Sequence, residues 1–519
     1  MAGVDCLPEE INVLSLNVWG IPYISQDRTT RIEEIGRQIV KANPQPHIVG
    51  LQECFSRGDF DRIHQETRSI LPYSKQYFAG PLGMGLVLLS RWPIEETSVT
   101  RYPLNGSPTA LFHGDWYAGK GVSYARVRYG KGPDDVINVF NTHLHAYYHG
   151  NEYLCHRVSQ AWELSKILGA ASRKCHGRAL TILLGDLNTE PTSLPYRILQ
   201  QFAPDIHDTW LQDSLRRTQG VRADQEAWWT DADVQSGVTY GSPRNTWMWT
   251  RTQRARYREE ESNSTGEVNF PADVGREEAA RIDYVFASVQ PDAVPCNRKT
   301  AENDLPTDGF GDKKGDNSSI TQDVDGWTVK SAKVGMMDRH PVLGCSLSDH
   351  FSVEVTFAFK KSKQVEGSMR TPEPVDEPTN SGSGVLTRPQ EGSESNVHIN
   401  ELQETVAVDE LLRKPDTVGF LDEILHVLED NGEMQKRSAW RRKARLIMAC
   451  MVLAGSLAGV WVVGEPGWAR LLLALAGASA STTAALDIWA NVSMTSAETA
   501  ALGEFEWEVR NIKRGLSED

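Results

Sequence analysis

Short apolar runs alternate with helical patterns through the first two thirds of this 519-residue chain. The runs are bounded by turn residues, as buried strands are: Ile11–Val18, Ile48–Leu51, Gly85–Leu89, Val136–Phe140 and Leu180–Leu184. Between them, Arg31–Lys41 and Arg157–Ala171 carry apolar residues at helical spacing. This alternation predicts a layered α/β sandwich over residues 1–360. Polar loop insertions are expected at about 252–281 and 297–324.

The composition changes after Phe359. Residues 361–400 are dense in Pro, Gly, Ser, Thr and Glu, which predicts a flexible linker. Residues 401–445 carry apolar positions in an acidic and then basic setting, which predicts short amphipathic helices next to a membrane. Residues 446–490 are predicted to hold two transmembrane helices, and 491–519 a cytosolic tail.

The two predicted spans are Leu446–Val463, which has no charged residue, and Pro466–Leu486, which has only Arg470. Tryptophans lie near their ends, as is typical of membrane interfaces. The alternative is a buried helical hairpin of a soluble domain. Basic residues precede the first span and follow the second, so the positive-inside rule places both ends in the cytosol. We therefore expect an integral membrane protein facing the cytosol from the endoplasmic reticulum or the mitochondrial outer membrane.

The formal net charge of −15 argues against a general polyanion-binding protein, because phosphate contacts need a surface of lysine and arginine. Acidic enzymes still act on phosphates when a divalent metal supplies the positive charge. The seven cysteines are scattered without a C-x-x-C pair, which indicates a reducing compartment and no zinc or disulfide framework. Residues 1–10 lack the features of a secretory signal, so we expect none.

Polar residues stand in or just after several apolar runs, so strand ends could deliver them to a common rim. The blocks are Ser-Leu-Asn17-Val-Trp-Gly, Leu-Gln-Glu53-Cys, Gly-Met-Gly-Leu-Val-Leu-Leu-Ser, Asn-Thr-His143-Leu-His145, Gly-Asp186-Leu-Asn188, Ile-Asp283-Tyr and Ser-Asp349-His350. Their oxygen ligands suit Mg²⁺ better than zinc. The histidines can donate to phosphate oxygens or transfer protons near neutral pH. Since no serine or cysteine nucleophile has a supporting motif, metal-assisted attack by water is the favoured chemistry.

In this order the blocks resemble the endonuclease/exonuclease/phosphatase superfamily of Mg²⁺-dependent phosphodiesterases, over about residues 11–358. The resemblance implies a four-layer α/β sandwich. The stretches 113–121, 142–148 and 156–164 are similar to the neutral sphingomyelinase family, in which two C-terminal membrane spans are a further trait. The likeness is closest to the fungal branch, the inositol phosphosphingolipid phospholipases C.

The resemblance also implies site residues. The implied Mg²⁺ ligands are Glu53, Asn17 and Asp349. The implied catalytic positions are His350, Asp186, Asp283, His143 and Asn188. His350 would activate water with Asp283 orienting it, or Asp186 would be the general base, and this choice stays open. His143 and Asn188 would hold phosphate oxygens.

Gly114-x-x-x-x-Gly119-Lys120 comes close to a phosphate-binding P-loop, but Gly121 replaces the Ser or Thr that would bind Mg²⁺, so we expect no ATP site. The resembling family instead makes Asp115 and Lys120 contributors to activity, and we expect both to bind substrate. His145 and Tyr147 or Tyr148 are candidates to line the headgroup pocket. An aromatic lip near the bilayer, or core packing, is expected of four tryptophans: Trp228, Trp229, Trp247 and Trp249.

The predicted function is hydrolysis of the phosphodiester of inositol phosphosphingolipids or sphingomyelin to ceramide and a phosphorylated headgroup. Anionic phospholipid is an expected activator, because Arg441, Arg442, Lys443 and Arg445 precede the first span. No nucleic-acid partner is expected. The alternatives are a membrane-tethered nuclease of the same superfamily and a non-catalytic membrane scaffold. The sequence decides neither the headgroup nor the oligomeric state.

Overall fold

The structure is a computed structural model that describes residues 7–106, 113–148, 152–173, 177–218, 236–263, 274–275, 278–290, 325–361, 417–462, 467–493 and 495–518. Most of the predicted linker and the insertion at 297–324 therefore lie outside the described residues. The insertion predicted at about 252–281 begins as a helix, α8 (Arg251–Asn263).

Two six-stranded sheets form the centre of the molecule. The first has the order β11-β12-β1-β2-β4-β3 and the second β5-β6-β7-β8-β10-β9. The strands of the first sheet are β1 (Glu10–Asn17), β2 (Ile48–Gln52), β3 (Tyr73–Gln76), β4 (Val87–Ser90), β11 (Gly326–Gly335) and β12 (Ser352–Lys360). Those of the second are β5 (Ile94–Arg101), β6 (Gly121–Arg128), β7 (Val136–His143), β8 (Leu180–Asp186), β9 (His207–Asp208) and β10 (Asp283–Ala287).

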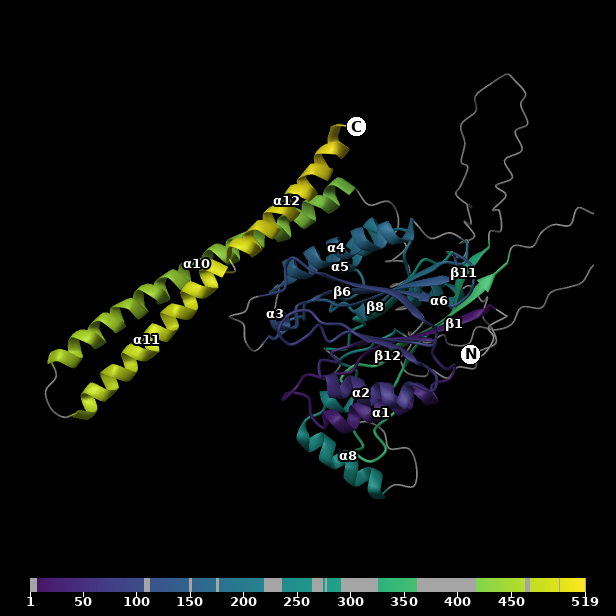
Figure 1. The fold of residues 1–519 in the computed structure, drawn as a ribbon, viewed down its shortest axis with the longest axis horizontal. Coiled ribbons are helices and arrows are strands. Elements are labelled where there is room, and N and C mark those ends of the chain that lie inside the picture. The colour runs from purple at the N-terminus through teal and green to yellow at the C-terminus, as the bar shows by residue number, and fades with distance from the viewer. Residues whose placement is uncertain are drawn as a thin grey trace, which may run out of the picture.

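Helices cover the outer face of each sheet (Figure 1). The helices of the sandwich are α1 (Arg28–Lys41), α2 (Arg57–Thr67), α3 (Asp115–Ala118), α4 (Leu154–Ser172), α5 (Leu194–Phe202) and α6 (Thr209–Thr218), with a 3₁₀ turn η1 at Thr246–Met248. Helix α6 does not lie on an outer face, because its Trp210 joins the core between the sheets. Helices α1 and α2 lie against the first sheet, and α4 and α5 lie against the second.

Three apolar cores separate these four layers. Strand β1 shows the pattern, because Val13 points between the two sheets while Leu14 and Leu16 face α1. Helix α1 presents Ile32 and Ile35 to the same core, as the helical spacing predicts. This arrangement confirms the predicted four-layer α/β sandwich.

The two sheets approach each other closely at Gly50. A Cβ atom at this position would lie 2.5 Å from Cδ1 of Leu184 on the facing sheet. A larger residue would therefore push the sheets apart.

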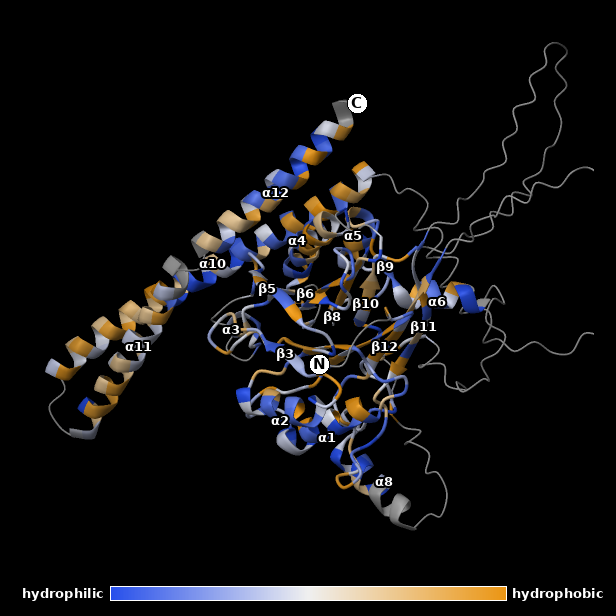
Figure 2. Cartoon of the chain, turned by 45° about the vertical axis from the view of Figure 1, so that its right-hand side comes forward, coloured by the Kyte–Doolittle hydropathy of each residue, from blue (hydrophilic) through white to orange (hydrophobic). Residues whose placement is uncertain are grey.

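The C-terminal part consists of three helices, α10 (Thr417–Val462), α11 (Gly467–Ser493) and α12 (Thr495–Glu518). Instead of the short helices predicted before the first span, α10 runs unbroken through 46 residues. We call residues 446–462 and 467–489 the hairpin arm. It projects away from the sheets (Figure 1) and is largely apolar (Figure 2).

The hairpin arm contains two helices that are long and apolar enough to cross a membrane. Their large apolar side chains are exposed, among them Ile447, Met448, Leu457, Leu471 and Leu472. A buried hairpin of a soluble domain, the alternative from the sequence, would cover these side chains with protein. The exposure therefore favours a lipid environment for the arm.

The chain after the arm returns to the sheets. Phe505 and Val509 of α12 and Phe420 of α10 are buried in the same core as Trp162 of α4. The indole Nε1 of Trp162 donates a hydrogen bond to Glu508 over 2.7 Å. The segment predicted as a cytosolic tail is thus packed on the sandwich, and it couples the arm to the sheets.

Candidate active site

The polar blocks meet at one edge of the two sheets. Six of the predicted side chains stand at strand ends there: Asn17, Glu53, His143, Asp186, Asp283 and His350. The parallel pairs β1–β2 and β7–β8 end at this edge, and β10 begins there, with Asp283 paired to Asp186. Parallel neighbours end at the same edge of a sheet, which is why residues far apart in the sequence assemble here.

A cluster of three side chains, His350, Asp283 and Asp186, forms the centre of the site, and within it His350 and Asp283 are hydrogen-bonded. His350 Nδ1 lies 2.8 Å from Asp283 Oδ2, and His350 Nε2 lies 3.8 Å from Asp186 Oδ2. All three side chains are buried. Burial alone would lower the pKa of His350, but the carboxylates led by Asp283 raise it well above its ordinary value. His350 is therefore held as a charged donor.

Asp186 is the carboxylate that the surrounding groups orient. Its Oδ2 accepts a hydrogen bond from Asn17 Nδ2 over 3.0 Å, and its Oδ1 accepts one from the Asn188 backbone N–H over 2.9 Å. Burial, followed by the charge of Asp283, raises the pKa of Asp186 to about 6. Asp186 is therefore mainly ionised at pH 7 and can accept a proton.

Glu53 and Asp349 form a second pair of carboxyls. Burial and then the neighbouring charge of Asp349 raise the pKa of Glu53 to about 7. Burial also raises the pKa of Asp349. Glu53 follows β2 directly with a φ of 58°, and its Oε2 is enclosed without a hydrogen-bond partner among the described residues. A non-glycine residue in this left-handed region is strained, which is common at functional sites.

His143 and Asn188 complete the predicted catalytic set. His143 Nε2 lies 3.4 Å from Asp186 Oδ2, and burial lowers the pKa of His143 well below its ordinary value. Asn188 has a φ of 46°, and its amide donates to the Leu144 carbonyl over 3.2 Å. Both side chains therefore lie beside Asp186, and His143 is neutral.

Lys120 and Asp115 form a buried ion pair of 3.1 Å beside this cluster. Burial would raise the pKa of Asp115, but Lys120 and the hydrogen bond from Tyr148 lower it. Asp115 is therefore fully engaged by the protein, and it fixes Lys120. His145 is buried against Asp115 at 3.9 Å. Tyr147, by contrast, is 65% exposed and lies outside the cluster.

The glycines that flank α3 have a structural explanation. Gly119 has a φ of 65°, and a Cβ there would lie 2.9 Å from the backbone nitrogen of Gly80. The P-loop-like spacing thus reflects a close approach of two backbones.

The tryptophans proposed for an aromatic lip do not form one in the described part of the chain. Trp249 is buried beside Tyr257, and Trp247 packs on Trp19. Trp228 and Trp229 lie outside the described residues. Core packing is thus correct for Trp249.

The structure adds residues that no motif marked. The Thr239 hydroxyl accepts the backbone N–H of Asp283 over 3.2 Å, and the Tyr240 ring lies 5.0 Å from that of His350. The buried Arg31 donates to the Leu347 carbonyl over 2.6 Å, just before the Ser-Asp-His block. These residues hold the site through backbone atoms and ring contacts, which leave no pattern in the sequence.

The residues present fit a divalent cation. Glu53 and Asp349 are neighbouring carboxyls, and Asp186 and Asp283 add two more in a group whose ligand atoms lie within 4.8 Å of one another; His350 of that group, as a charged donor, would not bind the cation. Oε2 of Glu53 and Oδ1 of Asp283 accept no hydrogen bond from the described residues. Enclosed carboxylate oxygens are costly without a partner, and hard oxygen ligands suit Mg²⁺. A divalent cation would supply the positive charge that these carboxyls need in order to be ionised together.

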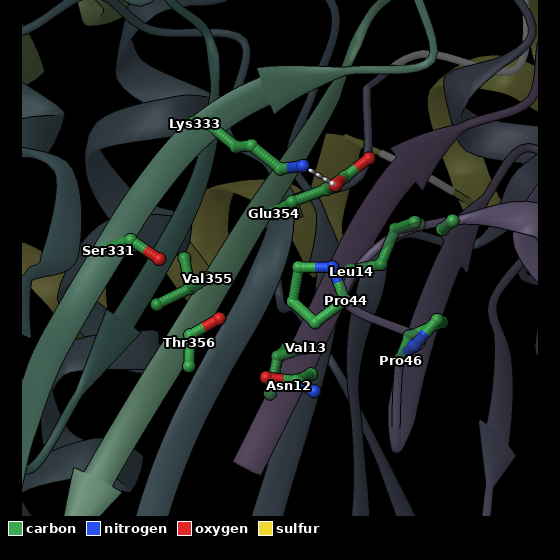
Figure 3. A pocket seen from close by; sticks show the side chains of 11 residues that line it. Asn12, Val13, Leu14, Pro44, Pro46, Ser331, Lys333, Glu354, Val355 and Thr356 are labelled. Carbon is green, nitrogen blue, oxygen red and sulfur yellow. Dashed lines mark ion pairs between the residues drawn. The ribbon is translucent and has the colours of Figure 1, made fainter. Parts of the chain in front are cut away.

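A shallow pocket elsewhere on the first sheet contains none of these residues. It lies on β1, β11 and β12, where Lys333 and Glu354 form an ion pair of 3.1 Å (Figure 3). Its remaining lining is mainly apolar or uncharged, so it offers no comparable chemistry.

Comparison with known proteins gives one family. Residues 14–350 match the Endonuclease/Exonuclease/phosphatase family. The chain is 34% identical over 355 residues to inositol phosphosphingolipids phospholipase C of Schizosaccharomyces pombe, covering 68% of this chain and 69% of that protein. It is 35% identical over 204 residues to human sphingomyelin phosphodiesterase 2, covering 39% of this chain and 46% of that protein.

Among solved structures, truncated TDP2 of Caenorhabditis elegans is similar at 17% identity and a TM-score of 0.40, covering 67% of this chain and 97% of that one. The assignment of the chain to a family rests on the sequence matches. The chain belongs to the Endonuclease/Exonuclease/phosphatase family, and its relatives there are neutral sphingomyelinases and inositol phosphosphingolipid phospholipases C.

Proposed function

We propose that this protein is a Mg²⁺-dependent sphingolipid phospholipase C. It would hydrolyse the phosphodiester of inositol phosphosphingolipids or sphingomyelin to ceramide and a phosphorylated headgroup. The observation that carries the proposal is the cluster of carboxyls and imidazoles at one sheet edge, with enclosed carboxylate oxygens that lack a partner. The names of the relatives support the sphingolipid substrate.

Glu53 and Asp349, with Asn17 beside them, would hold the Mg²⁺. The ion would neutralise charge on the phosphoryl group and on the leaving oxygen. The raised pKa of Glu53, to about 7, supports this role, because ionising both carboxyls in one enclosed place needs a compensating cation.

Side chains of the protein would accept and donate the protons of the reaction. Asp186 would accept a proton from the attacking water, since its pKa of about 6 leaves it ionised at pH 7. His350, kept charged by Asp283, would donate to a phosphoryl oxygen. The water oxygen would bond to phosphorus, and the bond from phosphorus to the ceramide oxygen would break. That oxygen would take a proton from solvent and leave as a hydroxyl, while Asp186 would release the proton it accepted to solvent. This assigns the general base, left open by the sequence, to Asp186.

Three further residues would bind the substrate. His143 and Asn188 stand beside Asp186 and would hold phosphoryl oxygens. Lys120, fixed by Asp115, would add positive charge near the phosphodiester. His145 and Tyr148 would help to hold this ion pair in place, because both contact Asp115.

The hairpin arm would anchor the enzyme in the membrane that contains its substrate. The basic residues before the first span would place the sandwich in the cytosol. Arg445 is engaged by Asp487 over 2.7 Å, so Arg441 and Lys443 are the better candidates for contact with anionic phospholipid. Activation by anionic phospholipid would follow, and equal rates in neutral and anionic vesicles would contradict it.

The test compares lipid and nucleic-acid substrates in one preparation. Full-length protein reconstituted with Mg²⁺ should release ceramide from ceramide phosphoinositol or sphingomyelin and leave plasmid DNA and RNA intact. Glu53→Gln should abolish the release, whereas Glu354→Gln, in the carboxyl of the pocket on β1, β11 and β12, should not. Cleavage of nucleic acid without lipid turnover would favour the nuclease, and no turnover of either would favour the scaffold.

A further inference from the structure

Exposed apolar side chains of the sandwich gather at one edge. In the described residues up to 361, eight large apolar side chains are exposed. Six of them lie on loops at the edge that carries the active site: Tyr23, Ile24, Phe78, Leu82, Tyr147 and Val342. The other two, Tyr73 and Val99, lie at the opposite edge and along an edge strand. Scattered exposed residues need no explanation, but a gathering beside an active site does.

Each of these loops adjoins a strand end that carries the site. We call them the rim loops: residues 18–27, 77–86, 144–148 and 336–351. Residues 18–27 follow Asn17, and residues 144–148 follow His143. Residues 77–86 enter β4, whose first residue pairs with Leu51 just before Glu53. Residues 336–351 contain His350 and enter β12.

Internal contacts hold two of the rim loops in shape. The Leu82 backbone N–H donates to the Tyr117 carbonyl of α3 over 3.0 Å, and Gly80 lies against Gly119. In residues 18–27, the guanidinium of Arg31 donates to the Gln26 and Trp19 carbonyls over 2.8 and 3.0 Å. The apolar side chains are thus exposed on fixed backbones.

Tyr23 is the clearest case. Its side chain is fully exposed, and its backbone adopts a φ of 68°. A bulky residue in this left-handed conformation is strained, and folding alone gains nothing from an aromatic ring in water. The ring therefore points to a partner outside the described chain.

The hairpin arm indicates which partner this is. In both views the arm projects on the side of the sandwich where α3 lies (Figures 1 and 2). Helix α3 begins with Asp115, the ion-pair partner of Lys120 in the site. Two apolar helices that could cross a membrane would therefore bring the bilayer towards the rim loops and not towards the opposite edge. Apolar loop tips bind a bilayer by burying their side chains at its interface.

We propose that the rim loops form a second membrane contact, in which Tyr23, Ile24, Phe78, Leu82 and Val342 insert into the bilayer around the mouth of the active site. The inference rests on the membrane attachment in the proposed function. The arm holds the enzyme in the membrane, and the rim loops turn the site towards it, so that a lipid phosphodiester enters without leaving the bilayer.

Photolabelling tests this contact without relying on activity. Full-length protein is reconstituted in phosphatidylcholine vesicles that contain a phosphatidylcholine with a diazirine in its acyl chain. After illumination, peptides with lipid adducts are identified by mass spectrometry. Adducts are expected on the arm and on residues 18–27, 77–86 and 336–351, and none are expected around Tyr73 or Val99. Adducts on the arm alone would overturn the rim proposal, and their absence from the arm would overturn the membrane attachment as well.

Matched variants sharpen the test. Phe78→Asp combined with Leu82→Asp should reduce labelling of residues 77–86 and turnover of vesicle-borne substrate by at least about tenfold. Turnover of a short-chain ceramide phosphodiester that stays monomeric in water should remain within about twofold. Tyr73→Asp combined with Val99→Asp, at the other edge, should change neither. Equal losses of turnover on both substrates would refute the proposal. Rim loops that remain unlabelled would refute it too, and would favour a soluble protein as their partner.

Discussion

Asp283→Asn is the most informative change at the site, because it should have two separable effects. The carboxylate lies 2.8 Å from His350 Nδ1, and both side chains are buried. Breaking a buried ion pair of this kind costs about 3–5 kcal/mol. If about 3 kcal/mol of that loss falls on the transition state, kcat/KM drops by roughly 100-fold or more.

The second effect concerns pH. Asp283 is the charge that most raises the pKa of Asp186, which stands at about 6. Asp186 acts when it is ionised, so activity is lost as the pH falls through its pKa. Without the charge of Asp283 that pKa falls, and the acidic limb of the profile should move to lower pH. The assay measures kcat/KM from pH 4.5 to 9 at saturating Mg²⁺, so that ionisation of the metal ligands does not limit the rate.

The combination of the two effects distinguishes the proposed roles. A lower rate with an acidic limb shifted to lower pH supports Asp186 as the base and His350 as the charged donor. A lower rate with an unshifted limb would refute that assignment. A rate within twofold of wild type would refute the participation of the pair altogether. Circular dichroism of the variant checks that the fold is retained.

Three other predictions follow from burial and charge. Without metal, Glu53 and Asp186 keep their protons in the folded protein up to about pH 7 and 6, whereas carboxyls of the unfolded chain lose theirs near pH 4, so the free energy of unfolding falls as the pH rises from about 4 to 7. Mg²⁺ binds the ionised carboxyls and should therefore raise the melting temperature more at pH 8 than at pH 5.5. Equal increases at the two pH values would contradict this. Lys120→Met removes the ion-pair partner of the buried Asp115 and should lower the free energy of unfolding, measured with a chemical denaturant, by about 3 kcal/mol. Adding Asp115→Asn to this variant should restore its stability but not its activity. Recovery of both stability and activity would mean that Lys120 has only a structural role. Val509→Asp places a charge in the core shared by α12 and α4 and should lower the free energy of unfolding of the sandwich by about 3 kcal/mol, and unchanged stability in detergent would show that α12 is dispensable.

Much of the sandwich could be predicted because its layers follow from local patterns. Ile32 and Ile35 mark a helix by their spacing, and the run from Ile11 marks a buried strand, whatever the rest of the chain does. Polar residues just after such runs could be expected at one rim, since parallel strands end together. Glu53 and Asp186 belong to the blocks that this pattern marks, and the family resemblance implies their roles.

Other features depend on contacts between distant segments. Asp115 was expected to contact substrate, but Lys120, Tyr148 and a backbone N–H occupy its oxygens. Thr239 acts through a backbone hydrogen bond that any hydroxyl could make, so no motif marks it. The rim loops are recognisable only once exposure is known, because Tyr23 in a sequence looks like any core aromatic.

The C-terminal helices illustrate the same limit. Hydropathy alone predicts the two apolar spans, because their length and composition are local properties. The return of α12 onto α4 depends on Phe505 and Val509 meeting Trp162, a contact across more than 300 positions of the chain. A charged C-terminal segment therefore looked like a solvated tail.

The most direct test of the central claim is hydrolysis of a sphingolipid in ¹⁸O-labelled water. Full-length protein in vesicles with Mg²⁺ is given ceramide phosphoinositol and, separately, sphingomyelin, and both products are analysed by mass spectrometry. Attack of water on phosphorus predicts unlabelled ceramide and one ¹⁸O atom in the phosphorylated headgroup, with no product from Glu53→Gln or in EDTA. Labelled ceramide, product formation in EDTA, or no ceramide from either lipid would contradict the account.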